Sequence, residues 1–302
     1  MKLQLEKRIR RGATEKFLRD VASLTCLMMA AAMVLSTGCF AHKEAPARPV
    51  SARGMAEAEA IAADVEALDL SGSGDKAVPA AVSSMPALRI LYLRGGAFGD
   101  FSALADLQAL EVLDLGRVKL AAMPAEVLSL SALRDLYLCE CGLNEFPQGL
   151  DALPHLRYLN LDRNSIAALP EALPPNLRWL RLNHNAITAL PEGIGALASL
   201  QRLYLRGNRL EALPESIAKC AALTDLDLSA NNLAEFPSTL AELPLLRNLD
   251  LTGNRRIETL PDNATLAKMS ALRTLRLTGC PLTNEERARV RAALHDSCAI
   301  IF

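Results

Sequence analysis

Leucine residues recur at fixed intervals along most of the chain. Four segments align without gaps: LRYLNLDRNSIAALPEAL (156–173), LRWLRLNHNAITALPEGI (177–194), LQRLYLRGNRLEALPESI (200–217) and LTDLDLSANNLAEFPSTL (223–240). Their starts lie 21 to 23 residues apart, and such a period indicates stacked repeats. Further copies begin at Leu88, Leu110, Leu133, Leu246 and Leu272, with a degenerate first copy at Val65. We therefore expect about ten repeats over residues 65–282.

Each copy has the alternation of a short strand followed by a turn and an irregular return. In the copy at 200–222, the residues predicted to point inward are Leu200, Leu203, Leu205, Leu210, Leu213, Ile217 and Cys220. One copy alone cannot enclose these side chains. Only stacked neighbours that share hydrogen bonds and close the core can fold.

The shared pattern LxxLxLxxN, followed by Leu-Pro, resembles the leucine-rich repeat family in its 23-residue Leu-Pro subtype. The resemblance implies an α/β solenoid, a curved horseshoe with short parallel strands on its concave face. It also implies a ladder in which one side chain after each strand bonds to the backbone of adjacent turns. The ladder residues are Cys141, Asn164, Asn185, Asn208, Asn231, Asn254 and Cys280. Gly96 and Val118 interrupt the ladder, so its N-terminal third should be looser.

Both ends of a solenoid need a cover, because the last layer would otherwise expose apolar surface. Residues 55–64 (MAEAEAIAAD) have a helix-forming composition and are predicted to cover the first repeat. Residues 283–302 resemble the helix-plus-strand cap of bacterial members of the family. There, Thr283 and Glu286 have the spacing of a capping box. A disulfide between Cys280 and Cys298 is one arrangement that the sequence permits.

The first 38 residues have the order of an export signal. Residues 1–20 carry an excess of positive charge, and residues 21–35 carry none. The following Ser36-Thr37-Gly38-Cys39 resembles the lipobox of bacterial lipoproteins, which implies a signal peptide at 1–38 and lipidation of Cys39. Ser36 departs from the family, which usually has Leu there. An uncleaved anchor over residues 21–40 and secretion without a lipid are the alternatives.

The segment after Cys39 completes the expected organisation. FAHKEAPARPVSARG is rich in Ala and Pro and is predicted to be a flexible tether. Residues 39–64 are therefore assigned to the tether and the N-terminal cap helix. The localisation that follows is the bacterial cell envelope, with a lipid anchor in the membrane. Phe40 in place of Asp favours the outer membrane over the inner, by resemblance to lipoprotein sorting.

Charge argues against nucleic acid as a partner. The chain has 33 basic and 34 acidic residues, of which residues 1–38 contain 7 and 3. Residues 39–302 therefore contain 26 basic and 31 acidic residues and have a net charge of −5. The sequence shows no basic stripe, and phosphate binding depends on clustered Lys and Arg. We therefore expect no binding of nucleic acid.

The third and fifth positions of LxxLxL are predicted to project onto the concave face. All four tyrosines and the only tryptophan occupy these positions. Exposed aromatic and arginine side chains on a rigid scaffold are typical of interface hot spots. The predicted partner-binding residues, including an acidic patch beside the aromatic ones, are Tyr137, Tyr158, Trp179, Arg181, Arg202, Tyr204, Asp225, Asp227 and Asp250. The alternatives are a family-typical use of Tyr, and acidic side chains that pair with neighbouring Arg.

No residue pattern indicates catalysis. His155 and His184 fall beside a core leucine and inside a turn, where a surface or packing role is expected. Cys139 and Cys141 alternate along a strand, so one should face outward and the other inward, and they cannot chelate a metal together. Nucleophile elbows, phosphate loops and zinc spacings are absent from the sequence. We expect no enzyme activity, no metal and no cofactor.

The sequence thus favours a monomeric, non-enzymatic module that binds a protein partner through its concave face, while the identity of the partner stays open. One alternative is a structural spacer of the envelope without a specific partner. Another is a cytosolic regulator of small GTPases, because the repeat subtype resembles the Ras-related intracellular group. The export-like N-terminus argues against the second alternative.

Overall fold

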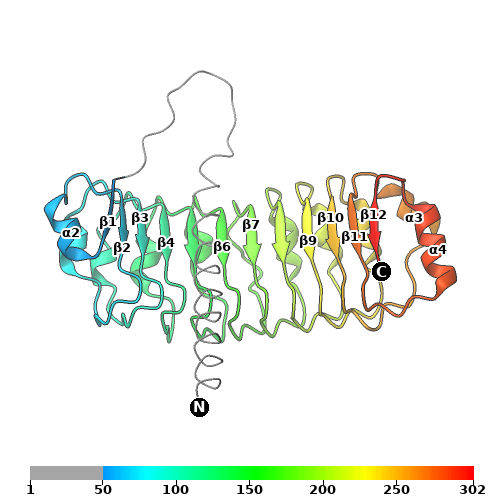
Figure 1. The fold of residues 1–302 in the computed structure, drawn as a ribbon, viewed down its shortest axis with the longest axis horizontal. Coiled ribbons are helices and arrows are strands. Elements are labelled where there is room, and N and C mark those ends of the chain that lie inside the picture. The colour runs from blue at the N-terminus through cyan, green and yellow to red at the C-terminus, as the bar shows by residue number, and fades with distance from the viewer. Residues whose placement is uncertain (1–49) are drawn as a thin grey trace, which may run out of the picture. The chain divides into compact units, whose positions relative to one another are not determined.

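The computed structural model describes residues 50–302, which we call the repeat unit. Within it, twelve parallel strands of three residues each form one open sheet, ordered as in the sequence (Figure 1). The strands are β1 (Ser51–Arg53), β2 (Ala67–Asp69), β3 (Ile90–Tyr92), β4 (Val112–Asp114), β5 (Asp135–Tyr137), β6 (Tyr158–Asn160), β7 (Trp179–Arg181), β8 (Arg202–Tyr204), β9 (Asp225–Asp227), β10 (Asn248–Asp250), β11 (Thr274–Arg276) and β12 (Ala299–Ile301). The predicted α/β solenoid is confirmed.

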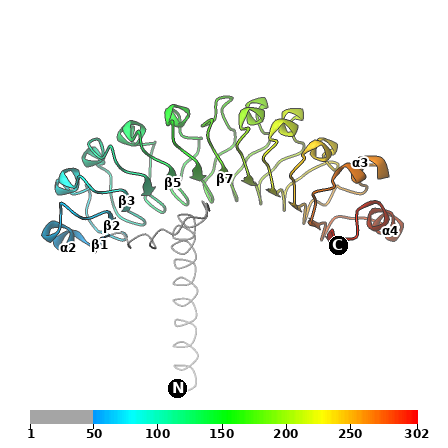
Figure 2. The ribbon, with the colours of Figure 1, turned by 90° about the horizontal axis from the view of Figure 1, so that it is seen from above.

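Short helices lie on the outer side of the repeat unit and the strands on its inner side (Figure 2). Proline directly precedes five of the 3-10 helices, since its fixed φ suits a helix start and no ladder N–H is needed there. The 3-10 helices are η1 (Ala80–Ser84), η2 (Ser102–Leu104), η3 (Ala125–Ser129), η4 (Leu150–Ala152), η5 (Glu192–Ala196), η6 (Glu215–Lys219) and η7 (Ser238–Glu242). In the longer copy that begins at Leu246, an α-helix, α3 (Asn263–Lys268), takes this place.

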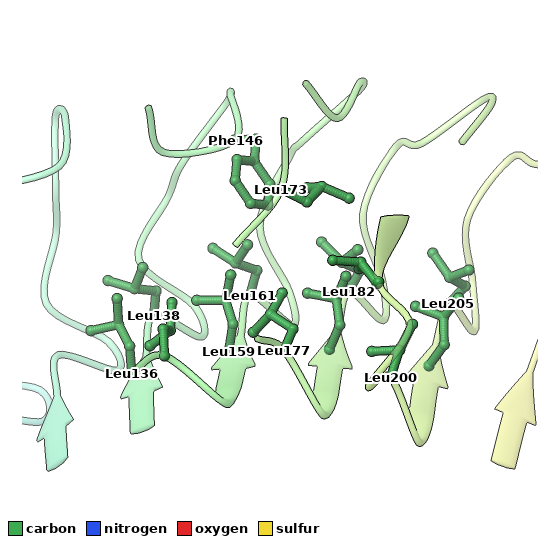
Figure 3. Packing of buried hydrophobic residues seen from close by; sticks show 14 of the residues in the cluster. Leu136, Leu138, Phe146, Leu159, Leu161, Leu173, Leu177, Leu182, Leu200 and Leu205 are labelled. Carbon is green, nitrogen blue, oxygen red and sulfur yellow. The ribbon is translucent and has the colours of Figure 1, made fainter. Parts of the chain in front are cut away.

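The core is a stack of leucine layers between the sheet and the outer segments. The central residue of each strand from β2 to β11 is a leucine that is at most 2% exposed. Leu136 and Leu159 of adjacent strands pack beside Leu138 and Leu161, and the next repeats continue the same layers (Figure 3). Because the central leucines pair directly from strand to strand, every repeat has the same register.

Side-chain amides join successive turns. The Asn164 Nδ2 group donates to the carbonyls of Leu138 and Leu161 at 2.8 and 3.0 Å, and its Oδ1 accepts from the N–H groups of Cys141 and Leu143 at 3.1 and 3.0 Å. Asn185, Asn208, Asn231 and Asn254 make equivalent bonds. At the cysteine positions, the thiols of Cys141 and Cys280 donate to the carbonyls of Leu115 and Leu251.

The ladder position at Gly96 is filled in a different way. A Cβ atom at Gly96 would lie 2.2 Å from the Phe98 ring, so this ring occupies the space that a ladder side chain would need. Phe98 is buried in the hydrophobic core. An apolar contact therefore stands where the later repeats have hydrogen bonds.

The N-terminal cover contains a strand that the sequence analysis missed. β1 lies inside the segment predicted to be a tether, and it pairs with β2 through Ala52 and Leu68. It has no leucine, and Ala52 is its buried residue, so the repeat pattern gives no sign of it. Helix α2 spans Met55–Ala60 and is shorter than the predicted 55–64.

The C-terminal cover consists of a helix and a strand. Helix α4 spans Asn284–Ala293, and the Thr283 side chain accepts a hydrogen bond from the N–H of Glu286, as a capping box requires. The Glu286 carboxylate does not accept the hydrogen bond from the N–H of Thr283 that would complete the capping box. It accepts instead from the N–H of Leu260 at 2.7 Å and from the Arg289 side chain. The cap is thereby tied to an earlier repeat. Cys280 and Cys298 are free cysteines, so the permitted disulfide is not formed.

Candidate protein-binding face

The register of the sheet places the third and fifth positions in two parallel rows, which together we call the concave face. The third-position row contains Ile90, Val112, Asp135, Tyr158, Trp179, Arg202, Asp225, Asn248 and Thr274. The fifth-position row contains Tyr92, Asp114, Tyr137, Asn160, Arg181, Tyr204, Asp227, Asp250 and Arg276. Adjacent strands are ~4.8 Å apart, so neighbouring side chains in these rows touch.

Aromatic rings and guanidinium groups form a stack across strands β5 to β8. The ring centroids of Tyr137 and Tyr158 are 4.8 Å apart, and Tyr158 meets Trp179 edge to face at 5.9 Å. The guanidinium carbon of Arg202 lies 4.2 Å from the centre of the Trp179 ring. That of Arg181 lies 5.3 Å from the centre of the Tyr204 ring. Both distances are within the range of cation–π attraction.

Arg181 is held by Asp162, a residue that the sequence analysis did not single out. Nη2 and Nε of Arg181 lie 2.7 and 2.8 Å from Asp162 Oδ2. The other carboxylate oxygen of Asp162 accepts from the N–H of Asn183 at 2.7 Å. Two contacts to one carboxylate fix the plane of the guanidinium group. The sequence signal was an acidic residue two positions before a ladder asparagine, with its partner in the next repeat.

The exposure predicted for two of the aromatic residues is wrong. Tyr137 and Tyr158 are 4% and 6% exposed, because large side chains on adjacent strands cover them. Trp179, Arg202 and Tyr204 stay partly exposed. A molecule that enters the concave face would therefore meet these three residues and the partly exposed Arg181, while Tyr158 packs against Trp179 and Tyr137 packs against Tyr158.

The predicted acidic patch lies next to the stack, around a depression of about 210 Å³ lined by Asp225, Asp227 and Asp250 together with Tyr204 and Arg276. Each carboxylate already has contacts within the chain. Asp225 accepts from Asn248 at 2.8 Å and lies 3.6 Å from Arg202. Asp227 accepts from the Ser229 hydroxyl, and Asp250 lies 3.5 Å from Arg276. These contacts favour the alternative of a polar surface that is paired internally.

At the other end of the stack, burial changes the chemistry of two carboxylates. Burial raises the pKa of Asp114, although the N–H of Gly116 and the Arg94 guanidinium oppose this effect. Burial also raises the pKa of Asp135 to about 6, against the opposing charges of Arg134 and Arg157. Asp135 is therefore partly protonated near neutral pH, and the concave face carries less negative charge than its formal count.

The candidate catalytic and metal-binding residues do not come together. Cys141 points into the ladder, whereas Cys139 lies beside Arg94, whose Nη1 is 3.1 Å from the Cys139 sulfur. His155 and His184 are both exposed. Within residues 50–302, no group of three or more His, Cys, Asp or Glu side chains is arranged to hold a metal ion. Nothing in this part of the chain indicates catalysis. No helix among the same residues is long and apolar enough to cross a membrane.

A row of basic residues runs along the edge where the strands begin, which we call the strand-entry edge. The backbone N–H of each residue in this row donates to the carbonyl of the residue before it, and the first residue, Arg89, donates to Glu66. The row consists of Arg89, Glu111, Arg134, Arg157, Arg178, Gln201, Thr224, Arg247 and Arg273. Six of these nine residues are arginines. The expectation of no basic stripe is therefore wrong, since a stripe exists in the folded chain although it is scattered in the sequence.

Two protein-family models match the chain. A model described as "Leucine-rich repeat region" matches residues 175–299, and one described as "Leucine rich repeat" matches residues 108–166. The chain is a leucine-rich repeat protein. Proteins of this family commonly mediate protein–protein binding. A search of curated proteins found no match to this leucine-rich repeat protein.

Solved structures show the same fold at low sequence identity. An internalin, InlF of Listeria monocytogenes, is 20% identical with a TM-score of 0.68, over 83% of this chain and 70% of that one. The plant peptide hormone receptor RGFR1, in complex with RGF2, is 22% identical with a TM-score of 0.58, over 77% of this chain. GASSHO1/SCHENGEN3 of Arabidopsis thaliana, in complex with CASPARIAN STRIP INTEGRITY FACTOR 2, is 23% identical with a TM-score of 0.59, over 78% of this chain. This leucine-rich repeat protein spans only 39% and 31% of the two receptors.

Proposed function

We propose that this leucine-rich repeat protein is a non-enzymatic binding module that holds a protein partner on its concave face. The observation that carries the proposal is the half-exposed edge of the aromatic–arginine stack, formed by Trp179, Arg202 and Tyr204. The guanidinium carbon of Arg202 lies 4.2 Å from the centre of the Trp179 ring, and the Arg202 side chain is still 40% exposed. Pre-stacked rings and guanidinium groups lose little conformational entropy when a partner covers them, which is a property of interface hot spots.

The chemistry of the face fits a protein better than a small molecule. The depression beside the stack is shallow and mostly polar in its lining residues, unlike the enclosed apolar pockets that bind drug-sized ligands. Aromatic and arginine side chains spread over several strands offer a broad contact area instead. Two solved structures of this fold are receptors in complex with RGF2 and with CASPARIAN STRIP INTEGRITY FACTOR 2, and they support the proposal by analogy alone.

Site-directed photo-crosslinking in the host cells tests the proposal. A crosslinking residue at Asn248, on the concave face, should give a discrete adduct with another protein, whereas one at Ser238, on the outer helix η7, should not. The double variant Trp179→Ala/Tyr204→Ala should reduce the adduct by about tenfold or more, as loss of a hot spot does. The matched control is Thr274→Ala/Arg276→Ala, from the same two rows.

A melting curve separates loss of binding from loss of fold. We expect both double variants to melt close to the wild type, because all four side chains are partly or fully exposed. An adduct that persists in Trp179→Ala/Tyr204→Ala, or that falls equally in the control, would rule out the stack as the binding site and favour a spacer without a specific partner.

We further propose that the module is anchored in the bacterial cell envelope through a lipid on Cys39, with the outer membrane favoured. Cys39 lies outside the described residues, so the support is the sequence of residues 1–39 alone. Intact mass measurement of the membrane-bound protein tests it. A chain that starts at Cys39 with added acyl mass, absent from Cys39→Ala, is the expected result. An unmodified chain that retains residues 1–38 would refute the anchor.

A further inference from the structure

Within the part of the chain that the structure describes, two arginines of the strand-entry edge lie side by side without an ion-pair partner. Arg157 and Arg178 precede β6 and β7, and the N–H of Arg178 donates to the carbonyl of Arg157 at 2.8 Å. The two residues are therefore one strand spacing apart, ~4.8 Å. Among residues 50–302, neither side chain takes part in an ion pair or a hydrogen bond.

The rest of the row shows how such charges are compensated elsewhere. Arg89 and Arg134 lie on the two sides of Glu111, at 3.3 and 2.9 Å from its carboxylate. Arg157 attracts the Asp135 carboxylate without forming an ion pair with it, as Arg134 also does. Like charges on directly opposed residues destabilise a sheet. The pair Arg157 and Arg178 is thus a concentration of positive charge that no ion pair among residues 50–302 neutralises.

A depression of about 270 Å³ adjoins the pair. Its lining consists of Arg157 and Arg178 together with Pro154, His155, Asn176 and Ser199. Among the described residues, no carboxylate lines it. The Asn176 amide is oriented by a 2.8 Å hydrogen bond from its Nδ2 to the carbonyl of Pro154. His155 and Ser199 are exposed, so the imidazole and the hydroxyl can both turn to a bound group.

We propose that these residues form a binding site for a phosphate group, with Arg157 and Arg178 as its principal ligands. Two guanidinium forks present parallel N–H donors that match the oxygens of a phosphate, and charge-assisted hydrogen bonds of this kind are stronger than neutral ones. Ser199, Asn176 and His155 add donors around it. The depression also leaves room for a small substituent, so the site suits a phosphate monoester. It is separate from the concave face and does not depend on the proposed function.

The row itself supplies the variants for the test. Gln201 is the neighbour of Arg178 in the same row, so Arg157→Gln and Arg178→Gln introduce a residue that the fold already accepts there. Arg247 is also exposed, in the same row, but is not among the residues that line the depression. Arg247→Gln therefore removes the same charge from the same edge without touching the proposed site.

Titration of the purified full chain with inorganic phosphate, followed by 31P NMR and calorimetry, tests the proposal. We expect saturable binding of one phosphate, weakened about tenfold or more in Arg157→Gln/Arg178→Gln and within about twofold of the wild type in Arg247→Gln. Chloride at equal ionic strength should not compete. Absence of saturable binding would overturn the proposal. An equal loss of affinity in Arg247→Gln would overturn it as well, because phosphate would then be attracted by the positive charge of the whole edge and not by one site.

Further titrations distinguish the source of the phosphate. Glycerol 3-phosphate represents a soluble ester, and a water-soluble short-chain phosphatidic acid represents a lipid headgroup, with short-chain phosphatidylcholine as its control. Equal binding of both phosphate monoesters, lost together in the double variant, would identify the phosphate itself as the ligand. Binding of phosphatidylcholine as strong as that of phosphatidic acid would contradict a phosphate site, because it would come from the acyl chains.

Discussion

At the scale of single residues, the partly buried carboxyl group of Asp135 affects stability directly. Its pKa is raised to about 6 by burial, so the folded chain binds a proton there more tightly than the unfolded chain does. Between pH ~4 and about 6 the folded state therefore holds the extra proton, and stability falls as pH rises through this range. Above this pH range, the ionised Asp135 carboxylate lowers the free energy of unfolding by a constant amount.

The variant Asp135→Asn removes this cost and is predicted to stabilise the protein at pH 8. A shift of two pKa units corresponds to ~3 kcal/mol, and partial exposure reduces the gain to about 1–2 kcal/mol. The gain should be much smaller at pH 4 and vanish well below it, where Asp135 is protonated in both the folded and the unfolded chain. Urea unfolding of the wild type and of Asp135→Asn at pH 4 and pH 8 measures the difference in the free energy of unfolding. An equal difference at the two pH values would show that the titration of Asp135 is not the cause.

The tyrosines show how the role of a residue depends on its neighbours. Tyr158 and Tyr204 both belong to the concave face, in its third-position and fifth-position rows, yet Tyr204 is partly exposed and Tyr158 is buried. Tyr158 has a ring on each side, from Tyr137 and Trp179, whereas Tyr204 is covered by the Arg181 guanidinium. Trp179 is the point where the buried rings end and the partly exposed surface begins.

At the scale of elements, the asparagine ladder ties each turn to the one before it. Asn254 is fully buried, donates to the carbonyls of Leu228 and Leu251 at 3.0 and 2.9 Å, and accepts from the N–H of Leu233 at 3.2 Å. Replacement by Ala leaves the buried N–H of Leu233 without its partner and removes one bond from each of two carbonyls, that of Leu228, which keeps the Asn231 amide, and that of Leu251, which keeps the Cys280 thiol. The free energy of unfolding should fall by about 3 kcal/mol, since the unsatisfied N–H costs ~1–3 kcal/mol and each of the two lost bonds contributes ~1 kcal/mol.

Asn254→Cys is the matched control for this prediction. The chain itself uses cysteine in the ladder, where the Cys280 thiol keeps a bond to the carbonyl of the preceding repeat, Leu251. Asn254→Cys should therefore lose only about 1–2 kcal/mol. Chemical denaturation of the three proteins gives the values. If Ala and Cys destabilise equally, the thiol does not replace any of the amide's hydrogen bonds at this position, and the prediction is wrong.

At the scale of the whole molecule, the repeat pattern was sufficient to predict the sheet and its register. The spacing LxxLxL determines which residues are central in each strand, so both rows of the concave face follow from the alignment. What it could not supply were contacts between repeats. The pairing of Arg181 with Asp162, the burial of Tyr137 and Tyr158, and the unbalanced charge of Arg157 and Arg178 all arise from neighbours in space. β1 was missed because a single buried alanine leaves no periodic signal.

Stability in a solenoid is close to a sum over neighbouring layers, so the ends can be tested separately from the middle. Val290 of helix α4 is fully buried against the last repeats, whereas Ala292 of the same helix is exposed. Val290→Asp places a charge in that contact and should loosen the C-terminal repeats first. Ala292→Asp adds the same charge on the solvent side and should change little.

The single tryptophan makes this uneven unfolding visible, because Trp179 lies in the middle of the repeat unit, in β7. In Val290→Asp, the urea transition followed by circular dichroism should begin at lower urea than the transition followed by Trp179 fluorescence. In the wild type and in Ala292→Asp, the two transitions should coincide, since an intact cap keeps the layers cooperative. Coincident transitions in Val290→Asp, displaced together to lower urea, would instead mean that the ten repeats and both caps unfold as one unit, and that the cap protects β7 as much as it protects its direct neighbours.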